Sequence, residues 1–218
     1  MKCILFDIDG TLMDFNQAER NAFIKTIKNF TDIIPNDEDI KMFSDINERL
    51  FNEFAKGNLT RIEFQKKRFR EIMNHMQIDG DEEIFNLCYR SAIEKEATLY
   101  DGVIEVLDYL KGKYRLFIAS NGMSKVQLQR LAIANIKEYF EDYFISDDIG
   151  YAKPDKNFFL RVMERVGNNN PKDYIMIGDR MDADIIGAKE VGMDGILFTK
   201  DALDCTTIKT IKELKNIL

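Results

Sequence analysis

The feature that most constrains the fold is an alternation of short apolar runs with helical patterns. Each run is too short for a helix and is rich in Ile, Leu, Phe or Tyr, which is typical of buried parallel strands. The runs are CILFDI, YRLFIAS, YIMIGD, GILFT and the shorter YFIS at 143–146. From about residue 100 to the end, such runs alternate with helical patterns. This alternation predicts a layered α/β domain whose crossovers are right-handed.

The interval from about 15 to 97 separates the first apolar run from the others and contains no convincing strand. Thr60 and Glu63 have the spacing of a capping box, and Asp81 precedes two acids that suit a helix N-terminus. Two further helices are expected over roughly 16–30 and 37–55. A cluster of basic residues in this interval, Lys66, Lys67, Arg68 and Arg70, is interpreted as one solvated helix face. The sequence therefore predicts a four-helix insert within the α/β domain.

Composition limits the partners that the chain can have. It has 218 residues and a net charge of -7, which argues against a nucleic-acid polymer or an anionic membrane as partner. No stretch approaches the roughly 20 apolar residues of a membrane span, and no signal peptide is visible. Three widely spaced cysteines indicate neither a disulfide framework nor a zinc site, so a cytoplasmic location is expected. The single histidine, His75, nearly excludes chemistry built on histidine.

Polar side chains gather where several predicted strands end. The first strand ends in Asp7 and Asp9, and the second ends in Ser120 and Asn121. Asp179 follows another strand, with Asp182 and Asp184 close behind, and Lys153 precedes a predicted helix. In an open parallel sheet, ligands bind beyond the carboxyl ends of the strands. These side chains therefore predict a site at that edge.

The acid-rich composition of this predicted site points to a metal ion and to phosphoryl chemistry. Two unit charges 4 Å apart repel by ~4 kcal/mol at an effective dielectric of 20, so a cation should lie among the carboxylates. Oxygen ligands without histidine or cysteine favour Mg²⁺. A magnesium ion and Lys153 would let an anionic phosphate approach an anionic carboxylate. Of the two acids after the first strand, one could then attack phosphorus while the other transfers protons.

Four segments together resemble the motifs of the haloacid dehalogenase superfamily of phosphohydrolases. DIDGTL is similar to the first motif, FIASNG to the second, AKPD to the third and IGDRMDAD to the fourth. They occur in the right order over nearly the whole chain. The resemblance implies a Rossmann-like three-layer α/β core with a central parallel sheet, and a four-helix cap domain between the first two motifs. The expected boundaries are a catalytic core over 1–14 and 98–218 and a helical cap over 15–97.

The resemblance also implies a role for each matching residue. Asp7 matches the nucleophile and a Mg²⁺ ligand. Asp9 matches the general acid and base, and its backbone carbonyl matches a second Mg²⁺ ligand. The remaining assignments are Thr11 as a residue that orients Asp9, Ser120 with the amide of Asn121 as phosphate binders, Lys153 as the cation between nucleophile and phosphate, Asp179 as a metal ligand, and Asp184 as an acid that acts through water or Lys153. Asp182 has a weaker claim.

Several functions share these motifs. True dehalogenases need neither an acid at the position of Asp9 nor a metal ion, so the retained acids favour phosphoryl transfer. Sugar-phosphate mutases carry all four motifs and stay open. A signalling receiver module would place its phospho-acceptor on a middle strand with an adjacent acid pair, unlike this chain. The favoured reading is a Mg²⁺-dependent phosphomonoester hydrolase that acts through an aspartyl-phosphate intermediate.

A closer resemblance suggests a substrate class. The segments FAKGNLTRIEFQKKRF and SNGMSKVQLQRLAIANIKEYFEDYFISDDIGYAKPDKNFF resemble the subgroup of nucleoside 5′-monophosphate phosphatases. A phosphosugar or phosphoglycolate remains an alternative substrate, because no residue of the cap indicates a site for a base or a ribose. The expected partner is a small phosphorylated substrate, and the expected assembly is a monomer or weak homodimer. Candidate residues for substrate choice are Phe15, Asn16, Asn47, Phe51 and Phe54.

Overall fold

The computed structural model describes residues 1–199 and 205–218, and it divides the chain into two compact units. One unit comprises Met1–Phe15 and Ala97–Leu218, and the other comprises Asn16–Glu96. Each boundary lies one residue from the boundary expected from the sequence. The first unit is called the α/β unit below, and the second is called the helical unit.

The α/β unit is built on one parallel sheet of six strands in the order β3-β2-β1-β4-β5-β6. The strands are β1 (Cys3–Phe6), β2 (Arg115–Ser120), β3 (Asp142–Ile145), β4 (Tyr174–Gly178), β5 (Asp194–Phe198) and β6 (Thr207–Ile208). The five apolar runs of the sequence correspond to the first five strands. The sixth has only two residues, too few to form a recognisable pattern, and the sequence did not predict it.

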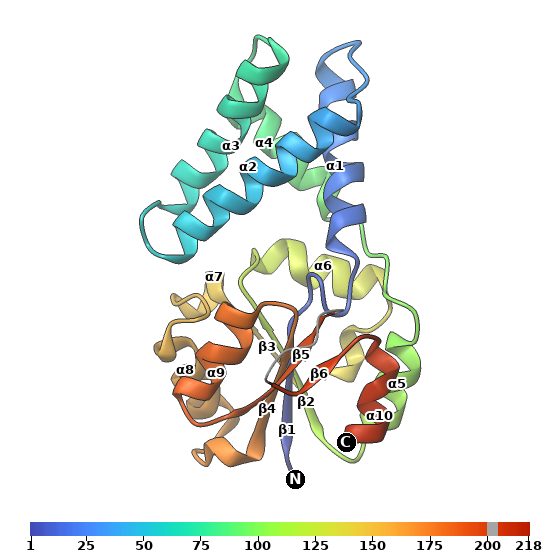
Figure 1. The fold of residues 1–218 in the computed structure, drawn as a ribbon, viewed down its shortest axis with the longest axis vertical. Coiled ribbons are helices and arrows are strands. Elements are labelled where there is room, and N and C mark those ends of the chain that lie inside the picture. Colours follow the sequence, from blue (N-terminus) through green and yellow to red (C-terminus); the bar gives the residue numbers. More distant parts are fainter. Residues whose placement is uncertain (200–204) are drawn as a thin grey trace. The chain divides into compact units, whose positions relative to one another are not determined.

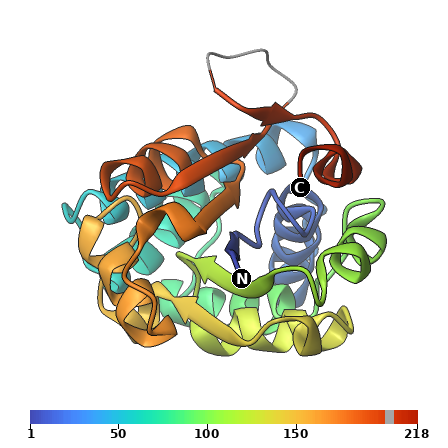
Figure 2. The same cartoon turned by 90° about the horizontal axis from the view of Figure 1, so that it is seen from below.

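Helices cover both faces of this sheet (Figures 1 and 2). Successive residues of β1 point to opposite faces. Ile4 and Phe6 pack in one apolar cluster, whereas Cys3 and Leu5 pack in the other. The first cluster includes side chains of α5 (Val103–Leu110), α6 (Ser124–Ile133) and α10 (Leu214–Ile217), and the second includes side chains of α8 (Lys156–Val166) and α9 (Gly187–Glu190). The short helix α7 (Ser146–Ile149) follows β3. The predicted three-layer architecture is confirmed.

The helical unit contains four helices, as expected from the sequence. They are α1 (Phe15–Phe30, whose first residue belongs to the α/β unit), α2 (Asp37–Ala55), α3 (Arg61–Met76) and α4 (Glu82–Ile93). The capping box of Thr60 and Glu63 is present at the start of α3, and the Asp81 side chain caps α4. Aromatic rings fill the interior, where Phe23 stacks on Phe43 with ring centroids 4.3 Å apart. These local signals fix the helix starts, and the apolar faces then pack together.

The basic residues of α3 do not form one solvated face, which corrects the sequence interpretation. Arg68 is buried, and its guanidinium donates to Asn47 Oδ1 at 2.9 Å and to Asn86 Oδ1 at 2.8 Å. Its side chain also lies over the Tyr89 ring, 4.4 Å from the centroid. Arg68 has this environment because it lies one turn after Phe64, on the face of α3 that is buried in the core.

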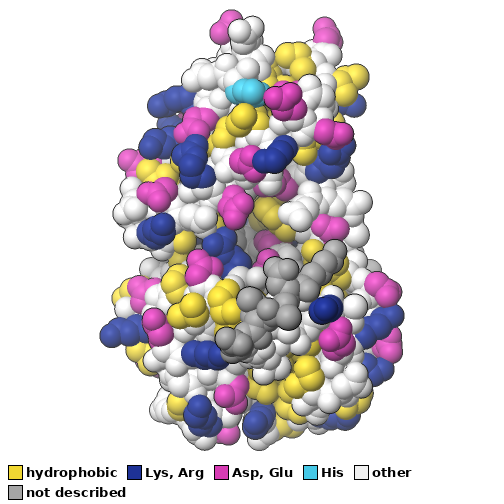
Figure 3. Space-filling model, viewed as in Figure 1, with side chains coloured by type: hydrophobic (Ala, Val, Ile, Leu, Met, Phe, Trp, Pro, Cys, Tyr) yellow, Lys and Arg dark blue, Asp and Glu magenta, His cyan; other side chains and the backbone are white. Residues whose placement is uncertain are grey.

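Both charge signs are interspersed on the molecular surface. On the face shown in Figure 3, Lys and Arg side chains alternate with Asp and Glu, and neither sign forms a continuous field. Within the two described ranges, none of the helices combines the length and the apolar character that crossing a bilayer requires.

Candidate active site

The predicted site residues lie around the carboxyl end of β1, in the middle of the sheet. The chain winds from β1 outward through β2 to β3, and then returns to the other side of β1 with β4. The strand order therefore reverses beside β1, which is where open α/β sheets bind ligands. Asp7 is the first residue after β1, and its backbone N–H donates to Ile177 O of β4 at 2.9 Å. This bond fixes Asp7 beside Asp179, which directly follows β4.

Lys153 joins this edge from a loop far away in the sequence. Its ammonium donates to Asp7 Oδ1 at 2.9 Å, to Asp184 Oδ1 at 2.6 Å and to the carbonyl of Ala119 at 2.6 Å. All three ammonium hydrogens are therefore engaged. Burial alone would lower the pKa of Lys153, but the carboxylates of Asp184 and Asp7 outweigh burial and raise it. Lys153 is thus a permanent positive charge in direct contact with Asp7.

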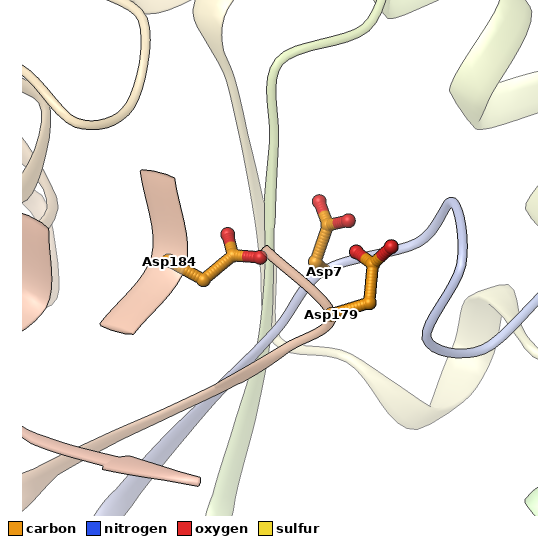
Figure 4. A group of neighbouring side chains, drawn as sticks. All are labelled: Asp7, Asp179 and Asp184. Carbon is orange, nitrogen blue, oxygen red and sulfur yellow. The ribbon is translucent and has the colours of Figure 1, made fainter. Parts of the chain in front are cut away.

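Three carboxylates converge at this edge, namely those of Asp7, Asp179 and Asp184 (Figure 4). One oxygen from each lies within 4.8 Å of the others. Burial raises the pKa of Asp7 well above its ordinary value, against the opposing effect of Lys153. Burial, with the charge of Asp184 next in importance, raises the pKa of Asp179 to about 7. One ammonium therefore does not balance the negative charge of this cluster.

The same cluster fits a hard divalent cation. Asp179 Oδ1 is buried and has no hydrogen-bond partner among residues 1–199 and 205–218, so it is an acceptor without a donor. Such a group is costly to bury unless something positive contacts it. The donor set contains carboxylate oxygens and no histidine or cysteine, which is the ligand chemistry of Mg²⁺.

The tight packing of Gly178 and Asp184 gives the first testable prediction. A Cβ atom on Gly178, the last residue of β4, would lie 2.1 Å from Asp184 Oδ2, so Gly178→Ala must displace this carboxylate. Asp184 would then lose its contact with Lys153, and misplacement on this scale costs about 10- to 100-fold in activity. Measurement of kcat/KM and of the thermal midpoint checks this expectation. Wild-type activity in a folded Gly178→Ala protein would contradict it.

Ser120 and Asn121 lie next to Lys153 but make different contacts. The Ser120 hydroxyl is buried and accepts from the backbone N–H of Gly122 at 3.2 Å. The side chain of Asn121 pairs at two points with the backbone of Lys153, because its Nδ2 donates to Lys153 O and its Oδ1 accepts from Lys153 N, both at 2.7 Å. The side chain of Asn121 therefore holds the backbone of Lys153 in place.

The structure gives Asp9 two partners that the sequence analysis missed. Gln127 Nε2 donates to Asp9 Oδ2 at 2.7 Å, and Arg130 donates to Asp9 Oδ1 at 2.5 Å. The hydroxyl of Thr11, which was expected to orient Asp9, is buried without a hydrogen-bond partner in the described part of the chain. Gln127 and Arg130 occupy buried positions of α6 together with Val126 and Leu131. Two polar residues on an otherwise apolar helix face were the sequence signal that could have identified them.

The remaining candidates are engaged with other partners. Asp182 is exposed and pairs with Arg180. Asn47, a candidate for substrate choice, is buried in the helical unit, where its amide donates to Glu19 Oε1 at 2.6 Å and accepts from Arg68. Phe51 and Phe54 pack on each other, with centroids 5.9 Å apart. These three side chains therefore have structural partners within the helical unit.

Comparison with known proteins shows similarity over most or all of the chain. The family model of haloacid dehalogenase-like hydrolases matches residues 1–192. HAD-hydrolase YfnB of Bacillus subtilis is 30% identical over 225 residues, covering 100% of this chain and 95% of YfnB. The pyrimidine 5′-nucleotidase PynA of Streptococcus pneumoniae is 28% identical over 208 residues, covering 93% and 86%. A glyceraldehyde 3-phosphate phosphatase of Methanothermobacter thermautotrophicus is 28% identical over 236 residues, covering all of both chains.

Among solved structures, the crystal structure of YfnB bound to magnesium superimposes with a TM-score of 0.94 at 29% identity. The alignment covers 100% of this chain and 98% of YfnB. The agreement in both sequence and structure extends over the α/β unit and the helical unit alike.

Proposed function

The chain belongs to the haloacid dehalogenase-like hydrolase family, and we propose that it is a Mg²⁺-dependent phosphomonoester hydrolase that forms an aspartyl-phosphate on Asp7. One observation carries this proposal. The ammonium of Lys153 contacts Asp7 within a cluster of three carboxylates that it cannot neutralise alone. Such a site suits a carboxylate nucleophile that must meet an anionic phosphate. The phosphatases and nucleotidases among its relatives support the reaction class.

Asp7, Asp179 and the carbonyl of Asp9 would hold the metal ion, with Asp184 alongside. When bound, a Mg²⁺ ion supplies positive charge that stabilises the phosphoryl oxygens. Lys153 supplies a second positive charge and keeps Asp7 in position through its hydrogen bond. Ser120 and the backbone N–H of Asn121 offer neutral donors for the remaining phosphate oxygens. These groups together replace the water that surrounds a phosphate in solution.

In the first half of the reaction, a carboxylate oxygen of Asp7 attacks phosphorus, and the bond between phosphorus and the ester oxygen breaks. The carboxyl group of Asp9 gives its proton to the departing oxygen, which leaves as an alcohol. The phosphoryl group is then bonded to Asp7. Asp9 has become a carboxylate.

In the second half, water attacks the phosphorus atom of the aspartyl-phosphate. The Asp9 carboxylate removes a proton from this water, which restores its carboxyl group. The bond between phosphorus and Asp7 breaks, and inorganic phosphate leaves. The sum is one ester and one water converted to one alcohol and one phosphate.

Removal of divalent metal should stop this reaction. Chelation with excess EDTA is expected to lower turnover by at least about tenfold, because the stabilising charge is lost, and added Mg²⁺ should restore it. Mg²⁺ should also raise the thermal midpoint of the metal-free protein, since it relieves the repulsion among Asp7, Asp179 and Asp184. Full activity in excess EDTA would refute a metal role.

For the substrate, we propose nucleoside 5′-monophosphates. The support is the similarity to PynA, a pyrimidine 5′-nucleotidase, over 93% of this chain. A phosphorylated three-carbon sugar is the second candidate, because the similarity to glyceraldehyde 3-phosphate phosphatase covers the whole chain at the same identity. The residues around Lys153 would contact only the phosphate, so they do not separate these candidates.

A panel of phosphomonoesters tests the substrate proposal. Phosphate release is measured with Mg²⁺ for pyrimidine and purine nucleoside monophosphates, glyceraldehyde 3-phosphate and phosphoglycolate, with the Asp7→Asn protein as the blank. We expect kcat/KM for the best nucleoside monophosphate to exceed that for glyceraldehyde 3-phosphate and phosphoglycolate by roughly 10–200-fold, the range that one pocket contact supplies. Turnover of the sugar phosphate alone would overturn the nucleotidase assignment and leave the aspartyl-phosphate mechanism standing.

A further inference from the structure

The helix α6 contributes two buried polar side chains to the candidate site. It buries four residues, of which Val126 and Leu131 are apolar and Gln127 and Arg130 are not. Burial of a guanidinium is unfavourable unless it is paired and hydrogen-bonded. The side chain of Arg130 is only 1% exposed, and its salt-bridge partner is Asp9. A buried charge on this helix is thus directed at one carboxylate of the site.

Gln127 and Arg130 engage both oxygens of that carboxylate. Gln127 Nε2 reaches Asp9 Oδ2 at 2.7 Å, and a terminal nitrogen of Arg130 reaches Asp9 Oδ1 at 2.5 Å. Each carboxylate oxygen has a second lone pair, which these bonds leave available. The Asp9 side chain remains 27% exposed, so its outer side can receive another group. Two donors on two oxygens fix the rotation of the carboxylate.

Gln127 also connects Asp9 with the phosphate-binding side of the site. Its Nε2 donates to the Ser120 hydroxyl at 3.1 Å, and its Oε1 accepts from Arg130 at 3.0 Å. The fit is close, since a Cβ atom on Gly122 would lie 2.5 Å from Gln127 Nε2. The chain Arg130–Gln127–Ser120 therefore holds Asp9 and Ser120 in a fixed relation.

We infer that Gln127 and Arg130 are positioning residues for Asp9 in proton transfer, an inference that rests on the proposed phosphatase function. They do not touch the reacting phosphoryl group. They hold the Asp9 carboxylate at one rotation so that its outer side meets the leaving oxygen and later the attacking water. Proton transfer depends on hydrogen-bond reach and alignment, so a carboxylate free to rotate would be a poorer acid and base.

The test uses Gln127→Met and Arg130→Met with two substrates. The leaving group of p-nitrophenyl phosphate needs little protonation. The alcohol that leaves from the most active alkyl phosphate of the panel must be protonated as it departs. We expect kcat for the alkyl phosphate to fall roughly 10- to 100-fold, within the usual worth of acid–base catalysis. KM should change by less than about threefold, and kcat for p-nitrophenyl phosphate should fall far less. Gln129→Met, an exposed position of α6, is the matched control.

Repeating both substitutions in an Asp9→Asn background separates positioning from general packing. If Gln127 and Arg130 act through Asp9, replacing either of them should lower kcat by less than about twofold in the Asp9→Asn protein, because the effects of coupled residues are not additive. Arg130→Lys keeps a cation near Asp9 and should recover part of the loss. If Arg130→Met does not fold, Gln127→Met decides the question, because it keeps the ion pair.

Equal losses on both substrates, or the same loss in the Asp9→Asn background, would overturn the inference. If Gln127→Met and Arg130→Met keep the wild-type kcat while Asp9→Asn lowers it, the inference is overturned and the proposed function stays intact. If Asp9→Asn itself turns over the alkyl phosphate normally, the acid–base assignment of the proposed function fails first.

Discussion

Asp7→Asn is expected to lower turnover by roughly 10⁴-fold or more, because loss of the nucleophile in covalent catalysis costs up to about 10⁶-fold. The amide has nearly the same shape as the carboxylate, so the fold should be kept. Burial raises the pKa of Asp7 well above its ordinary value, which means that its ionised form is unfavourable in the folded protein. The neutral amide removes this cost, and the thermal midpoint should stay the same or rise. Steady-state rates and thermal unfolding measure both effects.

Asp182→Asn is the matched control for this variant. Asp182 lies close in sequence to Asp179 and Asp184, but it is exposed and pairs with Arg180 instead of joining the carboxylate cluster. Exposed ion pairs contribute little, so its activity and stability should remain close to those of the wild type. Wild-type turnover in Asp7→Asn would refute the assigned nucleophile.

Lys153→Met is expected to lower kcat/KM by roughly 10²–10³-fold, the loss seen when one preorganised donor to a developing charge is removed. It should also destabilise the protein, because it leaves the buried carboxylates of Asp7 and Asp184 without their shared cation. Breaking such a buried pair costs about 3–5 kcal/mol. Added Mg²⁺ should narrow the stability difference from the wild type, since it supplies positive charge to the same cluster.

Lys156→Met controls for the loss of a lysine in the same region. Lys156 is exposed at the start of α8, three residues after Lys153. Its replacement should change neither the rate nor the unfolding midpoint appreciably. If Lys153→Met unfolds at the wild-type midpoint without Mg²⁺, Lys153 does not stabilise the carboxylates of Asp7 and Asp184 in the way inferred from its contacts.

The fold could be predicted largely because its signals are local. The apolar runs of β1, β2, β4 and β5 are continuous, and Thr60 and Asp81 mark the starts of their helices. The strand β6 was missed because two residues carry no periodicity. Arg68 was misplaced because its neighbours Lys66, Lys67 and Arg70 suggested a charged surface, whereas its own position relative to Phe64 places it in the core.

The candidate site could be predicted as a list of residues but not as a set of contacts. Asp7 and Asp179 are recognisable because they end strands, and parallel strands bring their ends together. The ion pair of Lys153 with Asp7 spans 146 positions and depends on how the loop folds back. Gln127 and Arg130 were missed because their function depends on a tertiary contact with Asp9, which only their place on a buried helix face hinted at.

The central claim is that the phosphoryl group is transferred to Asp7, and trapping it there is the most direct measurement. In Asp9→Asn, p-nitrophenyl phosphate should still phosphorylate Asp7, whereas hydrolysis of the intermediate should be slow. Acid quench, borohydride reduction and peptide mass spectrometry would then locate the group. We expect a burst of nitrophenolate matched by homoserine at position 7, and none in the Asp7→Asn protein. A burst without protein-bound phosphate, or a modification at any other residue, would contradict the account.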